Sequence, residues 1–131
     1  MAYMLFMVEP VGQRRTRTPE EGRAVFKRMV EWGDDLKARG LLLDVQSLSG
    51  TDSAARVQVR NGKARVVDGP FAEAKEMVGG YFLVNVKTQA EAVALASQCP
   101  AAEWCTVEVR SLAPCYDEST AGASSAAATT H

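Results

Sequence analysis

The chain contains segments whose apolar residues recur every second position and segments whose apolar residues recur every three or four positions. Residues 3–8 belong to the first kind, and both faces of the extended strand are apolar. Such a strand is predicted to lie inside a sheet with both faces covered. Residues 80–86 repeat this pattern, whereas residues 105–110 place Cys105, Val107 and Val109 on one face only. With residues 41–48, these segments predict the strands of one sheet.

Two segments have the period and the boundary residues of helices. In residues 19–39 an apolar stripe recurs at helical spacing, Thr18 is suited to cap the first turn, and Gly40 is suited to end the last one. Residues 88–98 begin with Thr88 and Glu91 at the spacing of a capping box. Both segments are therefore predicted to be helices that pack on the sheet.

A β-hairpin is predicted between the second strand and the strand at 80–86. Residues 54–60 and 63–67 alternate on either side of Asn61-Gly62, a dipeptide typical of two-residue hairpin turns. The order is strand, helix, strand, hairpin, strand, helix, strand, so we predict an α+β, ferredoxin-like βαββαβ fold with an inserted β-hairpin. Right-handed crossovers place both helices on one face, and the apolar opposite face predicts a homodimer.

The segment from Asp68 to Gly80 gathers the most distinctive residues of the chain. Asp68-Gly69-Pro70 predicts a tight turn, and it is followed by Phe71 and by three charged side chains, Glu73, Lys75 and Glu76. One interpretation is a functional cleft beside Asp68. The other is structural: Asp68 caps its own turn, Phe71 anchors the loop, and the charged residues face water.

Composition excludes several classes of function. The 131 residues are 47% hydrophobic and 24% charged with a net charge of −1, as in an ordinary single-domain globular protein. The balance predicts neither nucleic-acid nor membrane binding. Because the apolar run at 3–8 is too short for a signal sequence or a membrane span, a cytoplasmic location is expected.

The cysteines and the histidine restrict the chemistry further. Cys99, Cys105 and Cys115 show no C-x-x-C spacing and are expected to be free thiols, and His131 is the only histidine. Zinc or iron sites of the His/Cys type and Ser-His or Cys-His pairs are therefore not expected. No cofactor is predicted.

Arg14, Arg15 and Arg17 lie in the segment before the first predicted helix. The simpler interpretation is a solvated basic loop. The alternative is that arginines beside a helix N-terminus assist the binding of an anionic ligand.

The charged segment also carries a family resemblance. The segment from Asp68 to Tyr81 closely resembles the signature of the DGPF-type, YCII-related domain proteins. The matching residues are Asp68-Gly69-Pro70-Phe71, Glu73, Lys75-Glu76 and Gly79-Gly80-Tyr81. The resemblance as a whole covers nearly all of residues 3–112. The family implies a dimeric α/β-barrel, in which two ferredoxin-like sheets pack face to face. Residues 1–112 would form this domain, and the Ala/Ser/Thr-rich residues 113–131 would be a disordered tail.

The family's activity transfers only in part. Most DGPF-type proteins resemble small bacterial proteins of uncharacterised activity, and similar domains occur with extracytoplasmic-function sigma factors. Distant YCII-related members resemble enzymes with a His-Asp dyad whose histidine lies on the first helix. Residues 20–39 contain no histidine, so only Asp68 has a possible counterpart in this chain.

Two functional hypotheses follow. In the first, a small molecule binds beside Asp68, which acts as a catalytic acid or base, and the binding residues are Gly69, Pro70, Phe71, Lys75, Tyr81 and Arg110, with Trp32 as a further apolar wall. In the second, the chain is a non-catalytic dimeric binding or regulatory module, linked to a transcription partner such as a sigma factor.

Overall fold

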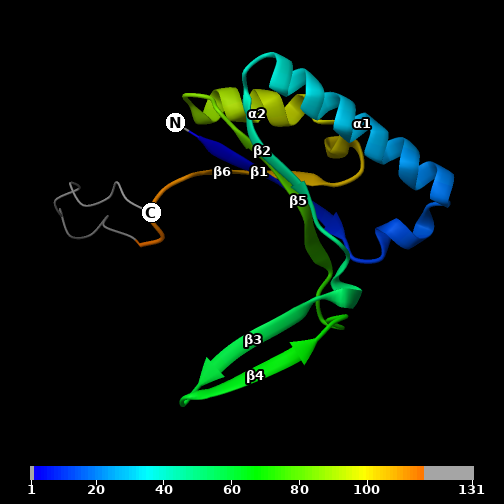
Figure 1. The fold of residues 1–131 in the computed structure, drawn as a ribbon, viewed down its shortest axis with the longest axis vertical. Coiled ribbons are helices and arrows are strands. Elements are labelled where there is room, and N and C mark those ends of the chain that lie inside the picture. Colours follow the sequence, from blue (N-terminus) through cyan, green and yellow to red (C-terminus); the bar gives the residue numbers. More distant parts are fainter. Residues whose placement is uncertain (1, 117–131) are drawn as a thin grey trace.

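A computed structural model describes residues 2–116 of the chain. Its main sheet has four antiparallel strands in the order β2-β5-β1-β6 (Figure 1). The strands are β1 (Tyr3–Pro10), β2 (Leu42–Ser47), β5 (Glu76–Val84) and β6 (Thr106–Ser111). The central strand β1 pairs with both β5 and β6. The fold is α+β, and this strand order agrees with a ferredoxin-like arrangement.

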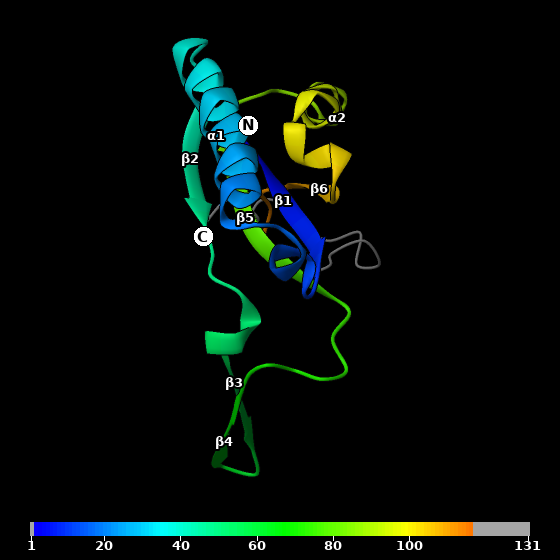
Figure 2. The same cartoon turned by 90° about the vertical axis from the view of Figure 1, so that its right-hand side faces the viewer.

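Two helices cover one face of this sheet, as the crossover rule predicts (Figures 1 and 2). They are α1 (Pro19–Ala38) and α2 (Gln89–Gln98), and each begins with a complete capping box, at Thr18 and at Thr88. Gly40 has a φ of 72°, a left-handed conformation that ends α1 at little steric cost. Single turns of 3₁₀ helix lie at η1 (Gln13–Thr16), η2 (Thr51–Ser53) and η3 (Pro100–Glu103).

The core lies between the helices and the sheet. Leu5 and Val84 from the sheet and Leu36 from α1 are completely buried. The rings of Trp32 and Phe82 pack edge to face with centroids 4.9 Å apart, so Trp32 is a core residue. Gly33 allows α1 to approach the sheet closely here, since a Cβ at this position would lie 3.4 Å from the Phe82 ring.

A two-stranded arm extends from the main sheet. It consists of β3 (Ala55–Arg60) and β4 (Lys63–Asp68), and the Asn61 and Gly62 of its turn both have positive φ. Every residue of both strands is exposed. The two views agree that the arm points to the side of the sheet away from α1 (Figures 1 and 2).

The helix-free face of the sheet has an apolar strip. Met4 and Phe6 of β1 lie opposite Leu83 and Tyr81 of β5, and all four are partly buried. None of the described helices lies over this face (Figures 1 and 2). The two-sided pattern of these strands thus corresponds to one helix-covered face and one open face.

The boundaries differ from the sequence prediction mainly at β5, which begins at Glu76 rather than at residue 80. Glu76 pairs with Pro10, and the Lys75 carbonyl accepts a hydrogen bond from the Val11 amide at 2.9 Å. Pairing with β1 therefore extends the strand back past Gly79 to Glu76, two residue types with low strand propensity. Most of the predicted tail, residues 117–131, lies outside the described residues.

Candidate functional site

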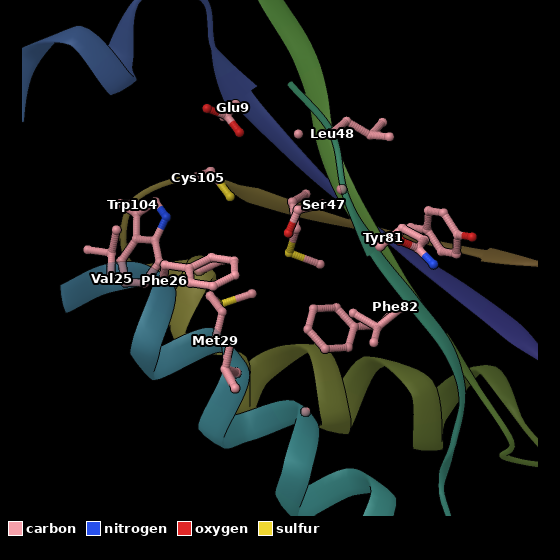
Figure 3. Close-up of a pocket in the computed structure, with 18 of the residues that line it drawn as sticks. Glu9, Val25, Phe26, Met29, Ser47, Leu48, Tyr81, Phe82, Trp104 and Cys105 are labelled. Carbon is pink, nitrogen blue, oxygen red and sulfur yellow. The ribbon is translucent and has the colours of Figure 1, made fainter. Parts of the chain in front are cut away.

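A pocket of about 910 Å³ lies between α1 and the sheet (Figure 3). One wall is the apolar side of α1 and the other is formed by β2 and β5, with Trp104 and Cys105 at one end. The apolar and aromatic residues of the lining include Met7, Val25, Phe26, Met29, Phe82 and Trp104.

The pocket exists because only part of α1 packs tightly on the sheet. Trp32, Gly33 and Leu36, in the second half of the helix, are buried. In the first half, Phe26 remains 57% exposed although it widens the apolar stripe formed by Val25, Met29, Trp32 and Leu36. The same stripe therefore supplies core residues at one end of the helix and a pocket wall at the other.

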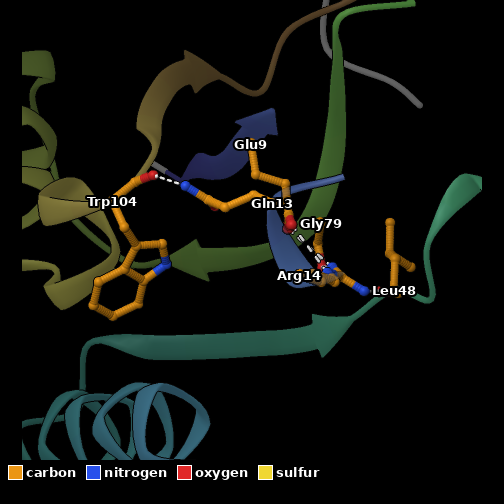
Figure 4. A network of polar contacts seen from close by, with 6 residues as sticks. All are labelled: Glu9, Gln13, Arg14, Leu48, Gly79 and Trp104. Atoms are coloured by element: carbon orange, nitrogen blue, oxygen red, sulfur yellow. Dashed lines mark hydrogen bonds and ion pairs between the residues drawn. The ribbon is translucent and has the colours of Figure 1, made fainter. Parts of the chain in front are cut away.

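An ion pair between a buried carboxylate and a partly exposed arginine lies at the polar side of the pocket (Figure 4). Arg14 donates from Nε to Oε2 and from Nη2 to Oε1 of Glu9, both at 2.9 Å. The same guanidinium donates to the Leu48 carbonyl at 2.9 Å and to the Gly79 carbonyl at 3.4 Å. Glu9 is only 8% exposed. Arg14 thus compensates a buried carboxylate and links η1 to the end of β2 and to Gly79 within β5.

The two glycines of β5 have steric roles beside this pair. A Cβ on Gly79 would collide with the Glu9 carboxylate and crowd the Arg14 guanidinium. A Cβ on Gly80 would lie 2.7 Å from the Gln46 carbonyl oxygen of the neighbouring strand. Gly79-Gly80, singled out in the sequence, therefore leaves room for the ion pair and for close packing of β2.

Trp104, Cys105 and Arg17 form the end of the pocket near η1. The Gln13 side-chain amide donates to the Trp104 carbonyl at 2.7 Å (Figure 4). The Arg17 guanidinium carbon lies 5.8 Å from the centre of the Trp104 ring. Burial raises the pKa of the Cys105 thiol to about 11, with smaller contributions from Cys99 and Glu9. Cys105 is therefore a neutral thiol at pH 7, which does not suit it to be a nucleophile.

The loop after Asp68 packs on the base of the arm. The Gly69 amide donates to the Ala54 carbonyl at 2.7 Å, and a Cβ on Gly69 would collide with the carbonyl oxygen of Thr51. Phe71 is 8% exposed. The Arg56 guanidinium lies over the Phe71 ring, 3.8 Å from its centre, and pairs with Glu73 at 3.1 Å.

The structure brings only some of the sequence-predicted site residues together. Pro70 and Phe71 line a second, smaller pocket of about 270 Å³ with arginines of the arm. Asp68 is exposed, lies opposite Ala55, and is absent from the lining of both pockets. Lys75 is likewise exposed outside both linings.

Tyr81 and Arg110 are placed on the open face of the sheet. Tyr81 donates a hydrogen bond from its hydroxyl to Asp44 at 2.6 Å, and this bond raises the pKa of Tyr81. Tyr81 also contributes to the lining of the larger pocket, but its ring points across β2 to the other side (Figure 3). Arg110 is exposed opposite Met4.

Sequence reasoning missed Glu9, Trp104 and Cys105 as residues of a common pocket. Glu9 could have been noticed, because it continues the every-second-residue series of Tyr3, Leu5 and Met7 on the helix-covered face. A carboxylate at such a position requires a partner. Cys105 belongs to the apolar face of the strand at 105–110, but nothing in the sequence places it beside Glu9, and Trp104 carries no comparable pattern.

Within residues 2–116, no three His, Cys, Asp or Glu residues are grouped so that they could hold a metal ion. None of the helices in this range combines the length and apolar character needed to cross a membrane.

Comparison with known proteins gives one family. No curated protein sequence matches the chain significantly. The sequence model of the YCII-related domain family, however, matches residues 1–115, which includes every helix and strand described above. The chain therefore belongs to the YCII-related domain family.

Proposed function

We propose that this protein binds a small, largely apolar molecule in the pocket between α1 and the sheet. The observation that carries the proposal is the pocket itself, whose volume of about 910 Å³ lies in the range of small-molecule sites. Its wall is mostly apolar, and the ion pair of Glu9 with Arg14 lies at its polar side. Ligand sites of proteins commonly combine these features.

The pocket favours binding over acid–base chemistry. At the end of the pocket near η1, the Glu9 carboxylate is paired with Arg14, and the Cys105 thiol keeps its proton at neutral pH. The hypothesis that Asp68 works as an acid or base beside Pro70 and Phe71 remains a separate proposal. The larger pocket is the better candidate because its volume of about 910 Å³ suits a small molecule, whereas the smaller pocket measures about 270 Å³, and Asp68 lines neither of them.

Binding can be tested with N-phenyl-1-naphthylamine, a neutral dye that fluoresces in apolar sites. Val25→Trp adds a large side chain to the pocket wall and is expected to weaken dye binding at least tenfold. Val93→Trp is the matched control, because Val93 is 46% exposed on α2 and lies outside the lining. Equal dye affinity in both variants would contradict the location proposed for the ligand.

Asp68→Asn separates the two proposed sites in the same assay. A ligand under α1 predicts unchanged affinity in this variant, since Asp68 is not part of that lining. A ligand whose binding depends on the Asp68 carboxylate predicts a loss. Loss of dye binding in Asp68→Asn with an unchanged melting temperature would place the functional residues at the loop instead.

We also propose that the chain is a homodimer in which the open sheet faces of two copies pack together, as in a dimeric α/β-barrel. Met4, Phe6 and Leu83 form a partly buried apolar strip on this face, and the arm points to the same side. Sedimentation at micromolar concentration should give twice the 14.1 kDa chain mass. Leu83→Lys should give the single chain mass, and Val93→Lys should not. A wild-type protein that sediments as one chain would contradict the dimer.

A further inference from the structure

We infer that the ligand of the α1 pocket is an amphipathic anion whose acidic group binds Arg17 beside Trp104. This inference rests on the pocket proposed above as the ligand site. It adds the chemical class of the ligand and the residue that recognises it. Its basis is the distribution of charge around the pocket.

The three arginines before α1 have different surroundings. Arg14 is occupied by Glu9 and by backbone carbonyls, and Arg15 pairs with Asp52 at 3.2 Å. Arg17 lines the pocket and is partly buried, and it forms no ion pair with the residues from 2 to 116. A partly buried guanidinium has lost some of its hydration, so it gains more from an anion than a fully solvated one does.

The other charged groups at the Arg17 end of the pocket neutralise one another. Glu9 and Arg14 neutralise each other, and Cys105 is uncharged at neutral pH. Arg28 also lies over the Trp104 ring, at 5.4 Å, but its charge is matched by Glu103 at 2.8 Å. With respect to residues 2–116, Arg17 therefore remains an uncompensated positive charge beside an aromatic wall.

The far end of the pocket differs in charge. Asp34 and Lys37 line it from the last turns of α1, and they have opposite signs. The carboxylate of Asp44 accepts the hydrogen bond from Tyr81. An anionic group is therefore favoured at the Arg17 end, with the apolar body of the ligand extending along Val25 and Met29.

A carboxylate is the simplest acidic group that fits this description. The planar guanidinium of Arg17 can donate two parallel hydrogen bonds to a carboxylate. The Trp104 ring offers a flat surface for an aromatic or aliphatic body attached to it. Neither contact requires Arg17 to break an existing ion pair with a described residue.

Calorimetry with a matched pair of probes tests this inference. 2-Naphthoate and 2-naphthylmethanol share one ring system and differ in charge. The wild-type protein is expected to bind 2-naphthoate at least tenfold more tightly than the alcohol. In Arg17→Gln the affinity for 2-naphthoate should fall about tenfold, while the affinity for the alcohol should change less than twofold. Arg17→Lys should recover part of the loss.

Arg23→Gln is the control, since Arg23 is an exposed arginine of α1 outside the lining. Circular dichroism verifies that each variant is folded. If both probes bind equally and Arg17→Gln changes neither affinity, the anion inference is overturned while the pocket remains a ligand site. If neither probe binds and Val25→Trp has no effect on the neutral dye, the pocket itself is not a ligand site and both proposals fail.

Discussion

Glu9 and Arg14, five positions apart, form a two-bond ion pair at the junction of β1, β2 and β5, with both nitrogen–oxygen distances at 2.9 Å. The carboxylate is buried, and the guanidinium side chain is 39% exposed. The pair is therefore asymmetric. Glu9 depends on Arg14 for compensation, whereas the exposed edge of Arg14 retains contact with water.

Arg14→Met should destabilise the fold by about 2 kcal/mol, because it leaves a buried carboxylate without its partner and removes a donor from the Leu48 carbonyl. The partial exposure of Arg14 keeps this value below that of a fully buried pair. Urea denaturation monitored by circular dichroism measures the change. Arg23→Met, at an exposed site on α1, should stay within about 0.5 kcal/mol. Equal effects of the two substitutions would show that the pair does not stabilise the fold.

Glycine-to-alanine substitutions should have opposite signs at two positions. A Cβ on Gly79 meets the Glu9 and Arg14 side chains, so Gly79→Ala should destabilise the protein by displacing the ion pair. A Cβ on Gly22 meets nothing within 4 Å, so Gly22→Ala should stabilise α1 by about 0.5–1 kcal/mol. The change in melting temperature of each variant gives the sign of its effect on stability. A stabilising Gly79→Ala would contradict the packing described for β5.

The free energy of unfolding should fall in alkaline solution because of Cys105. Its pKa is raised to about 11 in the fold, whereas an unfolded cysteine titrates near about 8.5. Below the unfolded pKa both states keep the proton, and the full stabilisation is present. As the pH rises toward 11, the unfolded chain loses its proton first, so stability declines.

Urea titrations at intervals between pH 7.5 and pH 10.5 measure this decline. The slope should be smaller in Cys105→Ala. Val93→Ala, which removes an exposed apolar side chain and no titratable group, should retain the wild-type slope. An unchanged slope in Cys105→Ala would show that other groups cause the decline.

Phe71→Ala should loosen the base of the arm without unfolding the main sheet. Phe71 is buried beneath Arg56, whereas Phe26, the matched control, is 57% exposed. Hydrogen exchange should speed up at the amide of Gly69, which bonds to Ala54, and stay slow in β1. Phe26→Ala should leave both rates unchanged. Equal acceleration in β1 would indicate that Phe71 supports the whole domain.

The elements of the fold could be predicted because their local patterns agree with their tertiary environment. Thr18 and Thr88 form the expected capping boxes, and the Asn61-Gly62 turn joins two paired strands. The start of β5 at Glu76 could not be predicted, because Gly79-Gly80 interrupts the strand pattern of the sequence and pairing with β1 extends the strand past both glycines.

The site was less predictable than the fold. The sequence predicts a functional motif at Asp68, Gly69 and Phe71. In the structure, the close approach of Thr51 accounts for the glycine at position 69, and packing under Arg56 accounts for the aromatic ring at position 71. The larger pocket results from the way α1 diverges from the sheet. That divergence depends on tertiary packing, and nothing in the period of the α1 stripe distinguishes Val25 from Leu36.

The arm presents a different chemical surface on each side. Val57 lies opposite Val66 on one side, and Gln58 lies opposite Arg65 on the other. Successive side chains of a strand alternate between the two sides, so a shift of the register by a single residue would exchange them. Because the Asn61-Gly62 turn fixes this register, it also fixes which side of the arm presents the valines and which side presents Arg65.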